Sequence, residues 1–171
     1  MSEASEELRS RQAPLKGRYR EDAAAAVVVL KAGASLDAEG VACRVDTGRA
    51  LVEAGLHPAT GGSGLQACSG DMLLEALAAC AGVTLRAVAT ALEIPVRGGR
   101  IETEGELDFR GTLGVSKEAP VGFMAIRVRF LLDTDASPEQ LATLLKLTER
   151  YCVVLQTLRT PPLVTATVVA A

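Results

Sequence analysis

The feature that most constrains the fold is the apolar run LLEALAACAGVTL, which occupies residues 73–85. Alanine and leucine are the strongest helix formers, so this run predicts a helix. We expect the helix to begin at Ser69, whose hydroxyl can cap free backbone N–H groups, and to end near Glu93, before Pro95. A helix this apolar has to be buried, and the rest of the chain must supply the surface that covers it.

The spacing of side chains along this helix predicts which of them face inward. One stripe at steps of four and three holds Leu73, Leu77, Cys80, Thr84, Ala87 and Ala91. The charged residues Asp71, Glu75 and Arg86 lean toward the other side. We therefore expect the Cys80 thiol to face the core.

Short runs of β-favouring residues surround the central helix. Three precede it, at residues 24–30, 41–45 and 49–54, with turn-rich segments between them. Two follow it, because apolar residues alternate with acidic ones over residues 101–109 and with arginines over residues 126–132. An acidic row opposite a basic row predicts that these two strands pair antiparallel.

A second helix and a final strand complete the expected order of elements. The tetrapeptide SPEQ at residues 137–140 predicts a serine cap with proline at the first helical position. If this helix continues to Arg159, Cys152 lies on its inward stripe. The segment LVTATVVA at residues 163–170 predicts the last strand. The fold class is therefore α+β, an antiparallel sheet packed against a long central helix and a second helix.

Length and charge exclude several classes of protein. A chain of 171 residues suits one domain, and we expect residues 1–14 to form an N-terminal arm and residues 15–171 a single domain. The net charge of -3 argues against a nucleic-acid partner. The acidic N-terminus is unlike a secretion signal, and no unbroken run of about 18 apolar residues occurs, so we expect a cytoplasmic protein with no membrane partner. The hydrophobic fraction of 49% predicts a homodimer interface.

Four cysteines, Cys43, Cys68, Cys80 and Cys152, are the residues of greatest chemical interest. In a reducing compartment they are core thiols, metal ligands or redox-active groups rather than structural disulfides. No C-x-x-C pair occurs, so we expect neither a bound metal nor a cofactor. Cys80 and Cys152 could share one pocket and bridge reversibly if their Cα atoms lie roughly 4.4 to 6.8 Å apart. Both could equally be small buried hydrophobes.

Cys68 raises a separate hypothesis. It follows a glycine-rich loop and directly precedes the central helix, where backbone N–H groups stabilise a thiolate. Cys68 is therefore a candidate for the more acidic thiol, and the alternative is a loop cysteine packed beneath the edge of the sheet.

Two segments together resemble a known superfamily. The stretch SGDMLLEALAACAGVTLRAVATAL at residues 69–92 and the stretch TERYCVVLQTL at residues 148–158 resemble the paired cysteine motifs of the osmotically inducible protein C (OsmC) and organic hydroperoxide resistance (Ohr) superfamily. The expected strand order agrees across roughly residues 16–169. The resemblance implies an OsmC-like fold and an intertwined homodimer with two active sites at the subunit interface.

The resemblance also implies a thiol peroxidase chemistry. By it, Cys80 attacks an organic or lipid hydroperoxide and becomes a sulfenic acid, and Cys152 condenses with that acid to form a disulfide. A dithiol reductant, either a small molecule or a protein, then reopens the disulfide by exchange. The alternative is a non-enzymatic OsmC-like dimer that binds an apolar small molecule, with the cysteines as pocket lining.

The chain departs from the family pattern at two points, and a third family residue, the pocket arginine, is not assigned. The family's peroxidases carry a glutamate about nine or ten residues before the first cysteine, whereas this chain has Gly70 and Asp71, which makes Asp71 the nearest candidate carboxylate. The alternative for Asp71 is a first-turn charge that favours the helix dipole. The second motif usually continues cysteine-proline, and here Val153 follows Cys152. No local motif selects the family's pocket arginine among Arg18, Arg20, Arg44 and Arg49.

Overall fold

The computed structural model describes residues 3–36, 43–45 and 54–170, with side chains for residues 10–29 and 54–170. The described elements, in chain order, are α1 (Glu3–Glu21), η1 (Ala23–Ala26), β1 (Val27–Leu36), β2 (Cys43–Val45), η2 (Pro58–Thr60), α2 (Ser69–Ala91), β3 (Gly98–Asp108), α3 (Phe109–Thr112), β4 (Phe123–Asp133), α4 (Pro138–Tyr151) and α5 (Val153–Arg159). They confirm the α+β class. The predicted strand at 49–54 lies outside the described residues except for its last position.

The described strands form one sheet in the order β2-β1-β3-β4, and each neighbouring pair is antiparallel. The predicted acidic and basic rows face each other on β3 and β4. Glu102 is opposite Arg129 and Glu104 is opposite Arg127, with N–O distances of 3.4 and 3.5 Å. Since these side chains are largely in contact with solvent, the ion pairs set the register more than they stabilise the sheet.

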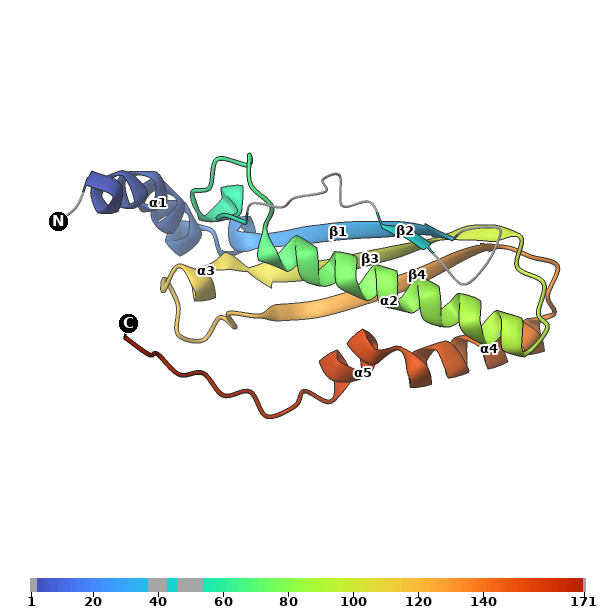
Figure 1. Cartoon of the computed structure of the whole chain (residues 1–171). Coiled ribbons are helices and arrows are strands. Elements are labelled where there is room, and N and C mark those ends of the chain that lie inside the picture. Colours follow the sequence, from blue (N-terminus) through green and yellow to red (C-terminus); the bar gives the residue numbers. More distant parts are fainter. Residues whose placement is uncertain (1–2, 37–42, 46–53, 171) are drawn as a thin grey trace.

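The α2 helix lies across one face of the sheet, and α4 and α5 run beside it (Figure 1). Within the core, the Thr103 hydroxyl on β3 donates a hydrogen bond to the Leu74 carbonyl on α2 at 3.0 Å. A Cβ on Gly105 would lie 2.4 Å from the ring of Phe123 and 3.3 Å from the side chain of Leu74. Glycine at this position therefore allows the helix and the strands to approach closely.

The length and composition of α2 would also suit a membrane span. Half of its 18-residue apolar window is buried inside the fold.

The phase of α2 differs from the sequence-based prediction. Its buried residues are Leu74, Leu77, Ala78, Ala81, Gly82, Leu85, Arg86 and Ala89. Leu73, expected inside, is 37% exposed, and Cys80 is half-buried at the border of the inward face. Arg86, expected outside, is buried and donates a hydrogen bond to the Val96 carbonyl. The helix does begin at Ser69, but Cys68 occupies the N-cap and makes no side-chain cap hydrogen bond.

The second helix begins as predicted and is then interrupted. The Ser137 hydroxyl accepts from the backbone N–H of Gln140, and the Gln140 side chain accepts from the backbone N–H of Ser137, which forms a complete capping box. Cys152 ends α4 and precedes α5, which closes at Arg159 as expected. The predicted continuous helix is therefore two helices with Cys152 between them.

Two terminal segments differ from their expected structure. Residues 163–170 form no strand in this chain, and the predicted last strand is wrong for the single subunit, because these residues meet no sheet edge. At the other end, α1 contains Pro14 inside the helix, and buried Tyr19 donates to the Ala59 carbonyl at 2.8 Å. The division into an arm of residues 1–14 and one domain stays a prediction.

The phase of α2 can be tested with two adjacent leucines. Leu74 is fully buried and Leu73 is 37% exposed. We expect Leu74→Ala to lower the free energy of unfolding by about 2 to 5 kcal/mol, because it opens a cavity beneath the helix, and Leu73→Ala to cost less than about half as much. Urea denaturation of both variants measures the difference. Equal losses, or a larger loss for Leu73→Ala, would contradict the observed phase.

Candidate functional site

The structure brings Cys80 and Cys152 together. Cys80 lies near the middle of α2 and is half-buried, whereas Cys152 is fully buried at the junction of α4 and α5. The two thiols lie close enough that each shifts the pKa of the other. Both belong to one apolar cluster that includes Leu77 and Leu144. Two thiols separated by most of the second half of the chain thus face each other across a helix junction.

The backbone at Cys152 explains how the second thiol reaches the first. Its φ of -71° and ψ of 107° are extended, so the helical path turns at this residue. The Cys152 N–H still donates to the Thr148 carbonyl at 2.9 Å, and the Cys152 carbonyl accepts from Gln156 at 2.9 Å. A proline at position 153 would impose the same extended conformation on Cys152. Here Val153 follows, and unlike proline it keeps a backbone N–H.

Hydrogen bonds make Cys80 the more acidic of the two thiols. Burial alone would raise the pKa of Cys80, but the Val154 N–H, the Cys152 thiol, the Thr84 hydroxyl and the Val153 N–H donate to its sulfur and together lower the pKa. The thiolate form is the nucleophile in thiol chemistry. Cys80 is therefore the thiol of this pair that is suited to attack.

Cys152 has the opposite character. Burial is the largest effect on the Cys152 thiol and raises its pKa. The Leu155 N–H lowers this pKa, and the neighbouring Cys80 sulfur raises it. Cys80 therefore ionises at a lower pH than Cys152. A protonated thiol can donate a hydrogen bond to its neighbour and can later surrender its proton when a disulfide forms.

Asp71 lies in the first turn of α2, away from the cysteine pair. Nine residues of helix place its backbone about 13 Å along the axis from that of Cys80. Asp71 is half-buried, so burial raises its pKa, while His57 lowers it. Asp71 is not among the groups that donate to or perturb Cys80. Its assignment as a site residue stays a prediction.

The remaining cysteines and the candidate arginines lie elsewhere or outside the described side chains. Arg18 and Arg20 lie in the last turn of α1, and the side chains of Arg44 and Arg49 are outside the described set. Cys68 is half-buried and packs against the second apolar cluster, which contains Leu74 and Phe109. Cys43 begins β2, and its side chain is outside the described set. Among the described residues, no group of three or more His, Cys, Asp or Glu side chains could hold a metal ion.

The sequence-based interpretation missed two polar groups. The spacing predicts Thr84 only as a core-facing position on the stripe of Cys80, whereas its hydroxyl is one of the groups that lower the pKa of the Cys80 thiol. The spacing of four residues was the signal that could have revealed this contact. The fully buried Thr148 hydroxyl, one turn before Cys152, makes no hydrogen bond with the described part of the chain.

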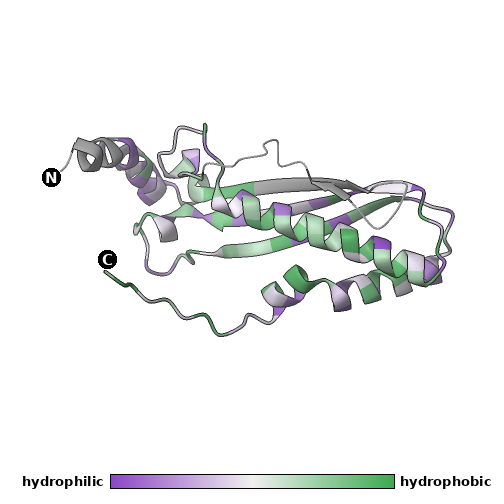
Figure 2. Ribbon diagram, viewed as in Figure 1, coloured by the Kyte–Doolittle hydropathy of each residue, from purple (hydrophilic) through white to green (hydrophobic). Residues whose placement is uncertain are grey.

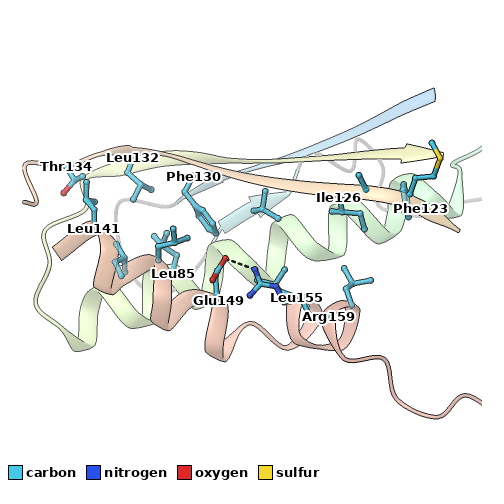
Figure 3. A pocket seen from close by; sticks show the side chains of 16 residues that line it. Leu85, Phe123, Ile126, Phe130, Leu132, Thr134, Leu141, Glu149, Leu155 and Arg159 are labelled. Atoms are coloured by element: carbon cyan, nitrogen blue, oxygen red, sulfur yellow. Dashed lines mark hydrogen bonds and ion pairs between the residues drawn. The ribbon is translucent and has the colours of Figure 1, made fainter. Parts of the chain in front are cut away.

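A large apolar cavity opens between β4 and the helices α4 and α5 (Figure 3). Its volume is about 820 Å³, and its lining includes Phe123, Ile126, Phe130, Leu141, Leu145 and Leu155. An ion pair of 2.8 Å between Glu149 and Arg159 bridges α4 and α5 at the cavity wall. Neither Cys80 nor Cys152 lines it, so the cavity is adjacent to the thiol pair rather than part of it.

The Val153 N–H provides a test of how Cys80 is activated. Val153 is the first residue of α5, a position at which proline is tolerated. We expect Val153→Pro to remove one donor from the Cys80 sulfur and to raise the pKa of Cys80, which slows its alkylation by iodoacetamide at neutral pH about three- to tenfold. Val153→Ala keeps the N–H and should leave the alkylation rate unchanged. Peptide mass mapping of Cys80 measures both rates, and equal rates would contradict a role for this N–H.

Comparison with known proteins adds a family and a fold. The model of the family described as OsmC-like protein matches residues 62–167. No curated protein matches the chain. Among solved structures, the chain is similar to an OsmC-like hydroperoxide resistance protein from Jannaschia sp. CCS1, with a TM-score of 0.59 over 81% of this chain and 91% of that chain, at 17% sequence identity. At this identity the likeness shows a shared fold.

Proposed function

This chain belongs to the OsmC-like protein family, and from that premise we propose that it is a thiol peroxidase that reduces organic or lipid hydroperoxides through Cys80 and Cys152. The observation that carries the proposal is the contact between a half-buried Cys80, whose pKa is lowered, and a fully buried Cys152, whose pKa is raised. The similar protein from Jannaschia is named for hydroperoxide resistance, which agrees with this chemistry.

The proposed reaction balances with one hydroperoxide and one dithiol. The Cys80 thiolate attacks the terminal oxygen of ROOH, the O–O bond breaks, and the alcohol ROH leaves after taking up a proton, so that Cys80 becomes a sulfenic acid. The Cys152 sulfur then attacks the Cys80 sulfur, water leaves with the Cys152 proton, and a disulfide forms. A dithiol reductant of the cytoplasm reduces this disulfide by exchange and is itself oxidised.

The surroundings of the pair suit an organic substrate. Cys80 packs against the apolar cluster that holds Leu77 and Leu85, and exposed Val153 lies beside it at the start of α5. Apolar walls favour the alkyl group of an organic hydroperoxide over the small polar molecule hydrogen peroxide. The complete burial of Cys152 shields it from attack, while the partial exposure of Cys80 gives the peroxide a route of entry.

The proposed active form is an intertwined homodimer with the thiol pair at the interface. The C-terminal segment 163–170 runs free of the sheet, and Figure 2 shows apolar residues along it. Leu163 is 93% and Val168 is 99% exposed, which is an unusual state for apolar residues. Exposed Met72 and Val83 on α2 flank Cys80 along the helix. A second copy would cover both surfaces.

The peroxidase proposal predicts a defined change in mass. Adding one equivalent of an organic hydroperoxide to the reduced protein should remove two hydrogens, a loss of about 2 Da, and join the peptides that contain Cys80 and Cys152. Cys80→Ser should abolish this loss. Cys152→Ser should instead stop at a sulfenic acid on Cys80 that dimedone traps.

Cys68→Ser is the matched control for these variants, because it removes a half-buried thiol of α2's N-terminus without touching the pair. It should react like the wild type. An unchanged mass after hydroperoxide treatment of the wild type, or a bridge that involves Cys68, would refute the proposed reaction.

The dimer proposal predicts that the two faces of the C-terminal segment contribute differently to dimerisation. Alternation places Val164 and Val168 on one face and Thr165 and Thr167 on the other. We expect Val164→Asp with Val168→Asp to weaken dimerisation at least about tenfold, because buried unpaired carboxylates are costly. Thr165→Asp with Thr167→Asp should have a smaller effect. Sedimentation velocity over a range of concentrations measures both, and a monomeric wild type would contradict the proposal.

The cavity beside the thiol pair favours a second candidate function. An apolar space of about 820 Å³ that neither cysteine lines could hold an apolar small molecule without redox chemistry. In that case the protein is a binding module, and the cysteines are packing residues beside the cavity rather than part of its lining. The mass measurement separates the two functions, because a binding module does not change in mass when hydroperoxide is added.

A further inference from the structure

The strand β4 is an edge of the described sheet. The described strands lie in the order β2-β1-β3-β4, so one side of β4 pairs with β3 and the other side has no described neighbour. Such an edge presents backbone N–H and C=O groups that can pair with a further strand. β4 is 11 residues long and contains neither proline nor glycine, the residues that interrupt pairing. This edge can therefore accept another strand over much of its length.

The two faces of β4 differ in polarity. Alternate residues of the strand line the apolar cavity beside α4 and α5, namely Ile126, Val128, Phe130 and Leu132. Between them, Arg127 and Arg129 form ion pairs with glutamates of β3. Because side chains alternate across a sheet, a strand added to this edge would have one face over the cavity and one face beside the arginines.

The C-terminal segment, residues 163–170, has the matching pattern. One face of an extended chain holds Val164, Ala166, Val168 and Ala170, and the other holds Thr165 and Thr167, with Leu163 and Val169 at its ends. Valine and threonine favour strands. An apolar face and a face with a polar centre are what the edge of β4 requires of a further strand.

The same segment is unsatisfied within one chain. It forms no strand there, and its large apolar residues are 81% to 99% exposed, namely Leu163, Val164, Val168 and Val169. It continues from the end of α5 through Pro161 and Pro162, which favour an extended path (Figure 1). Each copy of the chain carries both an open edge and a free segment. Two copies related by a twofold axis can exchange their segments, and both edges are then covered in one closed assembly.

We propose that the C-terminal segment of a second copy of this chain pairs with the free edge of β4 and places its valine face over the apolar cavity. The cavity beside the thiol pair is then completed by residues of two chains. This inference rests on the homodimer of the proposed function, and it adds the surface to which the segment binds. It does not depend on the peroxidase reaction.

Hydrogen exchange of the full-length protein, read by mass spectrometry of peptides, tests the pairing. In a strand, adjacent N–H groups point to opposite edges, so Ala166→Pro with Thr167→Pro removes one donor toward β4 in either register. Ala166→Ser with Thr167→Ser is the matched control and keeps both N–H groups. We expect the edge amides of residues 123–133 to exchange at least about tenfold faster in the proline variant than in the serine variant. β3, which pairs on both sides, is the internal reference for an intact subunit.

Photochemical cross-linking identifies the copy that supplies the segment. Chains with p-benzoylphenylalanine in place of Val164 are prepared unlabelled and labelled with ¹⁵N, and the two forms are refolded together. We expect cross-links from the segment to β4 to join labelled with unlabelled peptides. Cross-links found only within one isotopic form would show that each segment folds onto its own chain, which overturns the proposal.

A fluorescent probe of apolar surface tests the closure of the cavity. We expect anilinonaphthalenesulfonate to fluoresce at least about threefold more brightly with the proline variant than with the serine variant, because the cavity is open in the former. Equal fluorescence overturns the closure and favours a small molecule as the occupant. Equal exchange of β4 in the two variants overturns the pairing.

The failure of this inference and the failure of the proposed function give different results. A wild-type dimer whose β4 edge exchanges freely refutes the strand pairing and leaves the homodimer intact. A wild type that is monomeric at every concentration refutes both. A protein that shows the pairing but does not change in mass with hydroperoxide refutes the peroxidase reaction alone.

Discussion

The α2 helix is held against the sheet by buried leucines, and this contact determines where the Cys80 thiol lies. Leu74, Leu77 and Leu85 are almost completely excluded from water, and each such side chain contributes roughly 1.5 to 3 kcal/mol of hydrophobic stabilisation. Their positions fix the rotation of the helix about its axis. Cys80 then falls at the border of the buried face, where it is shielded on one side and reachable on the other.

The interruption between α4 and α5 completes this arrangement. A continuous helix would direct its backbone N–H groups into its own hydrogen bonds, and none would remain for a neighbouring sulfur. The extended backbone at Cys152 starts a new helix, and the first N–H groups of that helix, from Val153 and Val154, donate to Cys80. One local change in backbone conformation therefore places the Cys152 thiol and two backbone N–H groups beside the Cys80 sulfur.

The parts of the fold that local chemistry specifies were predictable from the sequence. The Ser137 cap and the pairing of β3 with β4 depend on neighbouring residues and on charge alternation, and both are confirmed. The phase of α2 was not predictable from its own pattern, because adjacent apolar residues such as Leu73 and Leu74 fit either choice of stripe. The prediction of a final strand is wrong for another reason. A strand needs a sheet edge to pair with, and residues 163–170 meet none in this chain. Thr84 was overlooked because a threonine on an apolar stripe resembles a simple space-filling residue.

Among the described residues, the groups that lower the pKa of Cys80 carry no formal charge. An arginine placed against the thiolate would itself have to leave water, and the desolvation of a cation consumes much of what the ion pair gains. Hydroxyl and N–H dipoles cost less to bury, and several of them can share the stabilisation of one negative sulfur. Neutral donors can in this way lower the pKa of a thiol in apolar surroundings without making those surroundings polar.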